Sequence, residues 1–494
     1  MKTLAAGMMT FAATFLVGAV LTALWVTGGT GRRLELRVSL GKPVGATGQG
    51  VPEQVVGELK AFDGKPADLR GSWPGFRGPN RDGVSDDFTE LARSWPAGGP
   101  KRLWELELGE GFAGCAVMGG RIYLQDYDAR RKRELIRCLS LADGKDIWEY
   151  GYKMPIKRSH GYSRTVPAVT DKHVVVMGAK CHVSCLDANS GRLLWDISLV
   201  RDYGTTIPTW YAGQCPLIDD GNAILAPCGK VVRAEDANGQ TVARGRNVLM
   251  MAVRCDSGQV AWEVPNDDGW DMTHSCVAVM ELEDYTRTYV YCGSGGVVGV
   301  SAKDGRVLWK NTEWTVSSAT VPMPVPVGEN KVFLCGGYGA GCMMLQVVRE
   351  GDRYAAQTLW RKGPNVFGSS QQTPIFYKSH LFGTRTDGQF TCLSGRGEVV
   401  WASGAGEKYG KDGGAYLVAD DLLFVLDDDG VMTLMKATPA AYSPLTRAKV
   451  LPGLHSWAPM ALVSGRLLAR DETRLVCFDV SKKANPPAGA EAEP

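Results

Sequence analysis

An eleven-residue phrase that ends in tryptophan recurs along the chain and constrains the fold more than any other feature. Its clearest copy is CLDANSGRLLW, at residues 185–195. The other copies are CLSLADGKDIW (138–148), AVRCDSGQVAW (252–262), GVSAKDGRVLW (299–309) and a form one residue shorter, CLSGRGEVVW (392–401). Repetition at about 40 to 50 residues is typical of propellers and other repeat architectures. The chain is therefore interpreted first as a repeat protein.

Each phrase predicts a strand, a tight turn and a second strand. The side-chain oxygen of an early Asp or Ser, such as Asp187, can accept hydrogen bonds from the N–H groups of the turn. A glycine such as Gly191 follows because glycine adopts positive φ angles at little cost. The tryptophan at the end presents a large flat apolar face on which a neighbouring repeat can pack.

The ends of the repeat region predict how it closes. A weaker repeat at 415–450 lacks the tryptophan, and the last segment, 458–479, carries three strands without a fourth. Residues 101–108 (KRLWELEL) resemble a fourth strand with no strands before it, so pairing the two pieces would close a ring and remove exposed sheet edges. We expect an all-β, eight-bladed β-propeller of four-stranded antiparallel blades over residues 101–480. Its blade-docking residues would be Trp104, Trp148, Trp195, Trp262, Trp309 and Trp401.

The phrase resembles the tryptophan-docking repeat of the pyrroloquinoline-quinone-like (PQQ-like) propellers, A-x-D-x-x-T-G-x-x-x-W. Residues 185–195 match it with Cys in place of the first Ala and Ser in place of Thr. Residues 138–148 and 299–309 keep the Gly and the Trp but carry Ser instead of Asp. The resemblance spans roughly residues 101–480 and implies the propeller fold. It does not imply quinone binding, because the family includes scaffolds without a cofactor.

The N-terminus carries an apolar run. Residues 4–27 hold no charged side chain and have about the length of a helix that spans a bilayer. A cleavable signal peptide has a shorter apolar region and a small-x-small site, which the residues around Ala23 and Gly28 match poorly. We predict an uncleaved membrane anchor within residues 1–27, with a cleaved signal as the alternative. The arginines that follow leave the orientation open, and the resemblance implies that the propeller lies on the exported, periplasmic side.

Three further segments flank the predicted propeller. Residues 28–72 lack apolar periodicity and contain several Gly and Pro, so we expect a flexible linker. Residues 73–100 begin with WPGFRGP, which resembles the W-P-x-F-R-G-P box that precedes the propeller in many planctomycete members of the family. We expect a strap or plug packed on the propeller. Residues 481–494 are rich in Pro, Ala and Glu and are expected to form a disordered tail.

Thirteen cysteines are many for an exported protein, and their number is odd. Several share one repeat position, namely Cys138, Cys185, Cys392 and Cys477. Equivalent positions in different blades should point into equivalent small sites of the core, where a free cysteine behaves as a small hydrophobic residue. Zinc is not expected, because the strand pattern around His182 separates the neighbouring cysteines from a common ligand face.

The loops that lead from each outer strand to the next inner strand should ring one mouth of the channel. They are rich in aromatic and polar residues, as in RSHGYSRTVP (158–167) and GWDMTHSCV (269–277). Concave sites with apolar walls and a few polar groups bind ligands, although the same side chains can simply cap strands and bind water. The candidate ligand-binding residues of this funnel are Arg164, Trp210, Trp270, Asp271, His274, Gln371, Lys411 and Trp457.

The interval between Trp195 and Trp262 is about twenty residues longer than its neighbours. The excess is residues 230–247, which lie between a second strand and a third and should emerge on the same mouth as the aromatic loops. The segment predicts a lid or partner-binding hairpin above the funnel, with a plain surface insertion as the alternative.

Two functions compete. The first is a membrane-anchored binding or scaffold protein, because the chain resembles the propeller subunit of the outer-membrane barrel-assembly machinery, which binds partners and has no catalytic residues. The alternative is a PQQ-dependent dehydrogenase, which needs a base near the quinone and oxygen ligands for calcium. Asp271 and Asp412 could serve these roles, but neither lies in a recognisable motif of that family.

The sequence favours the binding protein. It contains no adjacent cysteine pair and no Cys-x-x-Cys-His haem motif. The net charge of +2 provides no global field that would recruit nucleic acid. We expect a monomeric propeller without a cofactor that meets a protein partner or a small-molecule ligand at its mouth, with PQQ and calcium as the alternative.

Overall fold

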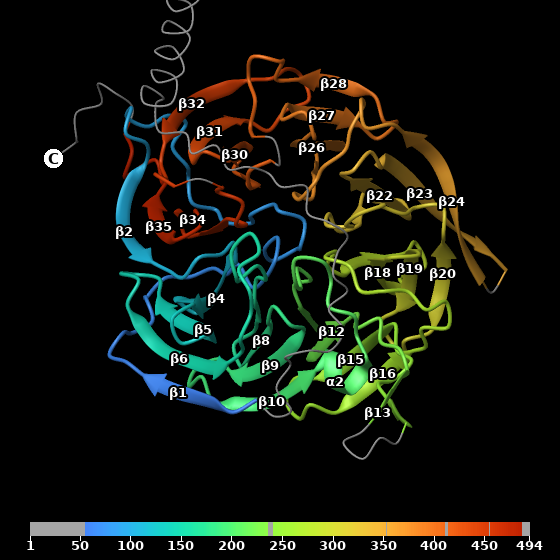
Figure 1. Cartoon of the computed structure of the whole chain (residues 1–494). Coiled ribbons are helices and arrows are strands. Elements are labelled where there is room, and N and C mark those ends of the chain that lie inside the picture. Colours follow the sequence, from blue (N-terminus) through green and yellow to red (C-terminus); the bar gives the residue numbers. More distant parts are fainter. Residues whose placement is uncertain (1–54, 236–240, 352, 411–412, 454, 487–494) are drawn as a thin grey trace, which may run out of the picture. The chain divides into compact units, whose positions relative to one another are not determined.

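The computed structural model describes residues 55–235, 241–351, 353–410, 413–453 and 455–486. All of them lie in Ala46–Pro494, the second of two compact units into which the chain divides. In this part of the chain eight antiparallel sheets follow one another around a ring, and each sheet is one blade (Figure 1). Seven of these sheets have four strands and the first has five. The eight-bladed, all-β propeller expected from the repeats is confirmed.

The first four blades follow the order of the chain. Blade 1 contains β3 (Cys115–Met118), β4 (Arg121–Asp128), β5 (Arg133–Ser140) and β6 (Asp146–Lys153), and blade 2 contains β7 (Ala168–Val169), β8 (His173–Met177), β9 (His182–Asp187) and β10 (Leu193–Ser198). After the short helix α2 (Leu199–Tyr203), blade 3 contains β11 (Leu217–Asp219), β12 (Asn222–Leu225), β15 (Met250–Arg254) and β16 (Val260–Val264). Blade 4 contains β17 (Ala278–Glu281), β18 (Arg287–Gly293), β19 (Gly296–Ser301) and β20 (Val307–Asn311).

The remaining blades repeat the pattern. Blade 5 contains β21 (Val325–Pro326), β22 (Lys331–Gly336), β23 (Gly341–Glu350) and β24 (Arg353–Lys362), and blade 6 contains β25 (Ile375–Tyr377), β26 (His380–Thr384), β27 (Phe390–Ser394) and β28 (Val399–Ala402). Blade 7 contains β29 (Tyr416–Ala419), β30 (Leu422–Leu426), β31 (Val431–Lys436) and β32 (Pro444–Lys449). Blade 8 contains β33 (Ala461–Val463), β34 (Arg466–Arg470), β35 (Arg474–Asp479) and the N-terminal strand β2 (Lys101–Glu107).

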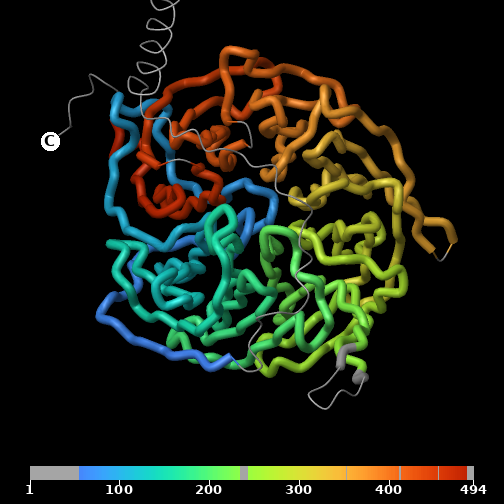
Figure 2. The backbone as a smooth tube through the Cα atoms, in the orientation of Figure 1, coloured from blue at the N-terminus to red at the C-terminus, as the bar shows by residue number. Residues whose placement is uncertain are grey.

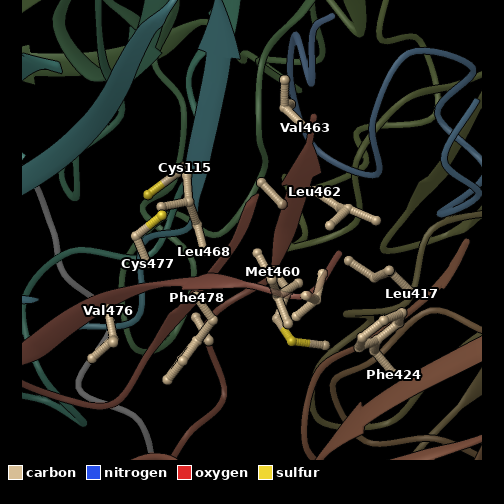
Figure 3. Packing of buried hydrophobic residues seen from close by; sticks show 14 of the residues in the cluster. Cys115, Leu417, Phe424, Met460, Leu462, Val463, Leu468, Val476, Cys477 and Phe478 are labelled. Carbon is tan, nitrogen blue, oxygen red and sulfur yellow. The ribbon is translucent and has the colours of Figure 1, made fainter. Parts of the chain in front are cut away.

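The ring closes between the two ends of the repeat region. Strand β2 lies beside β35 (Figure 1) and pairs with it antiparallel, as the sequence predicted. Trp104 lies opposite Cys477 in this pairing. The core at this join draws on three blades. Figure 3 shows Cys115 of blade 1 near Cys477 and Phe478 of blade 8, with Phe424 of blade 7 on the other side of the cluster. All 13 cysteines of the chain are free and buried.

The docking tryptophans reach from one blade to the next. Trp148 and Trp309 are buried, whereas Trp104, Trp195, Trp262 and Trp401 are partly buried. Four of them, and also Trp360 on the outer strand β24 of blade 5, donate their indole N–H to a carbonyl in the turn of the next blade. The pairs are Trp104 to Leu141 (3.2 Å), Trp148 to Ala188 (3.2 Å), Trp195 to Cys255 (2.9 Å), Trp360 to Gly395 (3.1 Å) and Trp401 to Thr438 (3.0 Å). Trp309 is an exception, because its buried indole nitrogen has no hydrogen-bond partner.

The structure corrects two expectations about the flanking segments. Part of the expected linker, residues 28–72, forms β1 (Gly57–Ala61), which pairs with β6 and covers the outer edge of blade 1. Part of the expected tail, residues 481–494, is ordered. The Asn485 side chain is buried there. Its amide accepts a hydrogen bond from the Lys101 N–H (3.1 Å) and donates one to the Asp479 carbonyl (2.7 Å), which holds the segment in place.

The segment expected to anchor the chain in a membrane, residues 1–27, lies outside the described residues. Among the helices that are described, none has the length and apolar character needed to cross a bilayer.

The strap, residues 73–100, enters the centre of the ring, where Figure 2 shows it as a blue tube. It hydrogen-bonds to inner strands of several blades. Trp73 forms a bridge with Val117 of blade 1, and Val84 forms one with Val418 of blade 7. The Val169 N–H of blade 2 donates to the Pro74 carbonyl (2.7 Å). The strap therefore packs on the inner strands of several blades, and a cavity of about 60 Å³ remains between it and blades 2 to 5.

Candidate functional site

The two mouths of the channel differ. Most strap contacts fall at or beyond the middle of the inner strands, as at Val117, Val169 and Val418. The loops that precede the inner strands therefore ring the opposite mouth, which we call the loop mouth. Neighbouring loops are joined there: the Phe112 N–H donates to the Ser163 carbonyl (2.7 Å), and the Gly111 N–H donates to the Glu472 carbonyl (2.8 Å).

One group of candidate residues, the arginine cluster, comprises His160, Arg164, Trp210, Tyr211 and His274. The Trp210 and His274 rings stack with centroids 6.3 Å apart and planes 24° apart. The His160 ring meets Trp210 edge-on, with centroids 6.2 Å apart. The Arg164 guanidinium lies over the Tyr211 ring, 6.0 Å from its centroid. Three of the predicted funnel residues, Arg164, Trp210 and His274, therefore meet in one place.

Burial dominates the electrostatics of this cluster. It lowers the pKa of Arg164 to about 10. It also lowers the pKa of His274 to about 4, and the nearby Arg164 charge acts in the same direction. His274 is therefore neutral at pH 7, and Arg164 stays charged.

A second group, the tryptophan cluster, comprises Phe112, His455, Trp457, Asp428 and Gln372. Trp457 lies between Phe112 and His455, with ring centroids 4.8 Å and 4.7 Å away. Its indole N–H donates to the Asp428 carboxylate (3.0 Å), and its carbonyl accepts from the Gln372 amide (3.1 Å). Trp457 is thus held by polar and aromatic contacts from loops of different blades.

Two other predicted residues serve local packing. Trp270 is buried against Gly293 and Gly295, where a Cβ atom would lie 2.6 Å and 2.2 Å from its ring. Asp271 pairs with Lys230 at 2.8 Å. This ion pair does not suit a calcium site, because the ammonium group occupies the carboxylate that calcium would need and repels a second cation. We therefore derive no chemistry through PQQ and calcium at Asp271.

The last two predicted funnel residues are Gln371 and Lys411. Gln371 is partly exposed, and its neighbour Gln372 makes the contact to Trp457 instead. Lys411 lies outside the described residues.

The insertion, residues 230–247, forms a hairpin of β13 (Val232–Glu235) and β14 (Thr241–Arg244). Figure 1 shows it at the outer rim of the ring beside α2, so the expected position above the funnel is wrong.

The backbone of the loop mouth is unusual. His160, Trp210, Tyr211 and His455 all have positive φ angles, of 50°, 67°, 74° and 58°. Bulky side chains rarely adopt this region, and such strain collects at sites of function. The sequence did not reveal it, since these residues follow no turn signature. The sequence also did not reveal Phe112, because its loop carries a single aromatic residue. It did not reveal Asp428 either, because the segment around Asp428 reads as a tight turn.

A comparison with protein families identifies the family of the chain. Residues 132–403, more than half of the chain, match the family model described as outer membrane protein assembly factor BamB. The chain belongs to this family. A comparison of this chain with curated proteins found no match.

Several solved structures are similar to this chain at low sequence identity. The computationally designed Ika8 protein is 11% identical, with 76% of this chain and 99% of that chain covered and a TM-score of 0.48. A quinohemoprotein alcohol dehydrogenase from Pseudomonas putida HK5 is 12% identical (86% and 82% covered, TM-score 0.43). BamB from Moraxella catarrhalis is 13% identical (88% and 100% covered, TM-score 0.37).

Proposed function

We propose that this BamB-family propeller is a binding or scaffold protein that meets a protein partner at its loop mouth. The observation that carries the proposal is the asymmetry of the channel. The strap fills the channel from one side, whereas aromatic and polar side chains gather at the other side on strained loops. Function concentrates in such loops when a rigid scaffold presents them.

The residue types at the loop mouth suit a protein partner. Trp, Tyr and Arg are enriched among the residues that dominate binding energies at interfaces. Trp210, Tyr211 and Trp457 are partly exposed, while contacts with neighbouring loops hold them in place. Side chains that are already ordered lose little conformational entropy on binding. The family match to an assembly factor supports the same proposal.

The proposed setting follows from the N-terminal sequence. Residues 4–27 would anchor the chain in a membrane, and the propeller would work on the exported, periplasmic side as a monomer. Fractionation of cells that express the full chain tests this part. Recovery of the full chain with the soluble proteins would contradict the anchor.

Photo-crosslinking tests the proposed interface. A photoreactive amino acid is placed at Trp210 or Trp457 of the full chain in cells, and at Leu359 or Val400 of the outer rim as controls. Leu359 and Val400 are exposed by 49% and 44%, so they report on nonspecific contact. We expect one discrete crosslinked partner at the loop mouth and none at the rim. Crosslinks at the rim alone would overturn the proposal.

The alternative is a PQQ-dependent dehydrogenase with its site in the same funnel. Absorbance of the purified protein with and without added PQQ and calcium separates the two functions. A stoichiometric bound quinone that is reduced by an alcohol would replace the scaffold proposal.

A further inference from the structure

Burial lowers the pKa of Arg77, Arg164 and Arg470, and the partners of these three side chains differ. Arg77 of the strap donates to four carbonyls, those of Arg81, Thr373, Asp82 and Pro374. Arg470 of β34 donates to the carbonyls of Ala113 (3.0 Å) and Gly109 (2.8 Å), and the Asp126 and Asp471 carboxylates lie near enough to stabilise its charge.

Arg164 has far fewer partners. Its Nη2 donates to the carbonyls of Ser159 and His160. Its Nη1 is shut off from solvent and donates to nothing, and no carboxylate pairs with it among the described residues. A buried charge normally requires a hydrogen-bonded counter-ion, because desolvation is costly. The guanidinium therefore lacks the anion that its setting requires.

The neighbours of Arg164 do not supply that anion. His274 is neutral at pH 7, and Tyr211 offers the face of its ring. No carboxylate belongs to the arginine cluster, and Arg164 gives the site a positive charge. One guanidinium with free N–H groups suits a singly charged carboxylate, which it can bind through a planar fork.

Two further features make this a prepared site. Tyr211 and Trp210 are consecutive residues with positive φ angles, and both rings lie in the cluster. Such paired strain persists only where the surrounding structure enforces it. Arg164 as a whole also keeps part of its surface open to solvent.

We propose that Arg164 binds a carboxylate group at the loop mouth, with the rings of Tyr211 and Trp210 holding the apolar part of the same ligand. This inference rests on the proposed function and names the chemistry of its site. A carboxylate can come from a small organic acid or from an acidic side chain or C-terminus of a protein partner. The chemistry is the same in both cases.

The test uses a matched pair of probes on the full chain. N-acetylphenylalanine carries a carboxylate, whereas N-acetylphenylalaninamide has the same ring without the charge. We expect the melting temperature to rise in a saturable way with the acid but not with the amide, at equal ionic strength. We expect Arg164→Gln to weaken binding of the acid at least tenfold. Arg158→Gln is the control, because Arg158 lies on the same loop and pairs with Glu110.

A stability measurement separates a binding role from a structural one. In chloride, Arg164→Gln should melt at or above the wild-type temperature, because it removes a buried charge without a counter-ion. A large loss of stability in Arg164→Gln would make Arg164 structural and overturn the proposal. Equal responses to acid and amide, or unchanged acid binding in Arg164→Gln, would overturn it as well.

The crosslinking experiment distinguishes the source of the carboxylate. If crosslinking at Trp457 is lost in Arg164→Gln, the carboxylate belongs to the protein partner. If the acid binds but no crosslink forms at the mouth, the ligand is a small organic acid and the protein-partner proposal fails alone. If the acid does not bind but crosslinking persists in Arg164→Gln, the scaffold proposal stands and the carboxylate site is refuted.

Discussion

The indole ring of Trp148 lies directly against Gly191, the turn glycine of the next blade. A Cβ atom on Gly191 would come within 2.5 Å of the ring, and the φ angle of Gly191 is 72°. The same relationship recurs around the propeller. The other pairs, with the corresponding distances, are Trp104 and Gly144 (2.8 Å), Trp195 and Gly258 (2.8 Å), Trp262 and Gly305 (2.7 Å), and Trp360 and Gly397 (2.9 Å). Each phrase thus supplies a ring to one neighbour and a glycine to the other.

This relationship predicts a large loss of stability when the ring is removed. Trp148→Ala should lower the free energy of unfolding by about 3 to 5 kcal/mol, because it leaves a cavity between blades 1 and 2. Gly191→Ala should also destabilise the protein, since both the space and the φ angle exclude a side chain. Chemical denaturation measures both effects, with the exposed Leu359→Ala as control, expected within about 0.5 kcal/mol of wild type. Equal stability of Trp148→Ala and the control would contradict the docking model.

The fold could be predicted because its signal is repeated and local. The turn chemistry of residues 185–195 recurs in five blades, and the incomplete ends at 101–108 and 458–479 implied their own pairing. The strand β1 could not be predicted, because it carries no phrase and is defined by its pairing with β6. The ordered turn around Asn485 likewise depends on a partner at the far end of the chain.

The site was only partly predictable for a similar reason. Position before an inner strand was enough to place Arg164, Trp210 and His274 at one mouth, where they meet. Position does not reveal which way a side chain points. Trp270 has the same placement but packs into its own blade under Gly293, and Asp271 pairs with Lys230.

Ring closure can be tested by truncation. A chain that starts at residue 55 keeps β1, the strap and β2, and we expect it to be monomeric and soluble. A chain that starts at residue 109 loses β2, so β35 becomes an open edge, and we expect aggregation. Light scattering and analytical ultracentrifugation report the difference. A soluble, monomeric chain without β2 would show that the pairing of Trp104 with Cys477 is dispensable.

The packing of the strap on the propeller should depend on the guanidinium of Arg77. Its planar fork reaches several carbonyls that a lysine ammonium group cannot reach together. Arg77→Lys should lower the free energy of unfolding by about 1.5 to 3 kcal/mol, the usual range for hydrogen bonds to a charged group. Arg93→Lys is the matched control on the same strap, because Arg93 is exposed and pairs with Asp420 at the surface. A loss of the same size in both variants would show that the strap does not depend on the buried fork.

The last prediction concerns acid stability and follows from His274. Its pKa is about 4 in the folded chain, because of burial and the nearby Arg164 charge, against 6.5 for an ordinary histidine. Between these pH values the unfolded chain binds more protons than the folded chain, so the free energy of unfolding must fall as the pH drops. A shift of this size contributes up to about 3 kcal/mol, fully present above pH 6.5 and lost on approach to pH 4.

Two variants isolate this contribution. His274→Gln should flatten the fall in the free energy of unfolding between pH 6.5 and pH 4.5, measured by urea denaturation at each pH. His182 should contribute separately, because burial lowers its pKa to about 4 as well. Arg164→Gln should flatten the profile less than His274→Gln, because it removes the charge that lowers the His274 pKa but leaves the burial in place. A profile in Arg164→Gln that equals that of wild type would show that the Arg164 charge does not lower the His274 pKa.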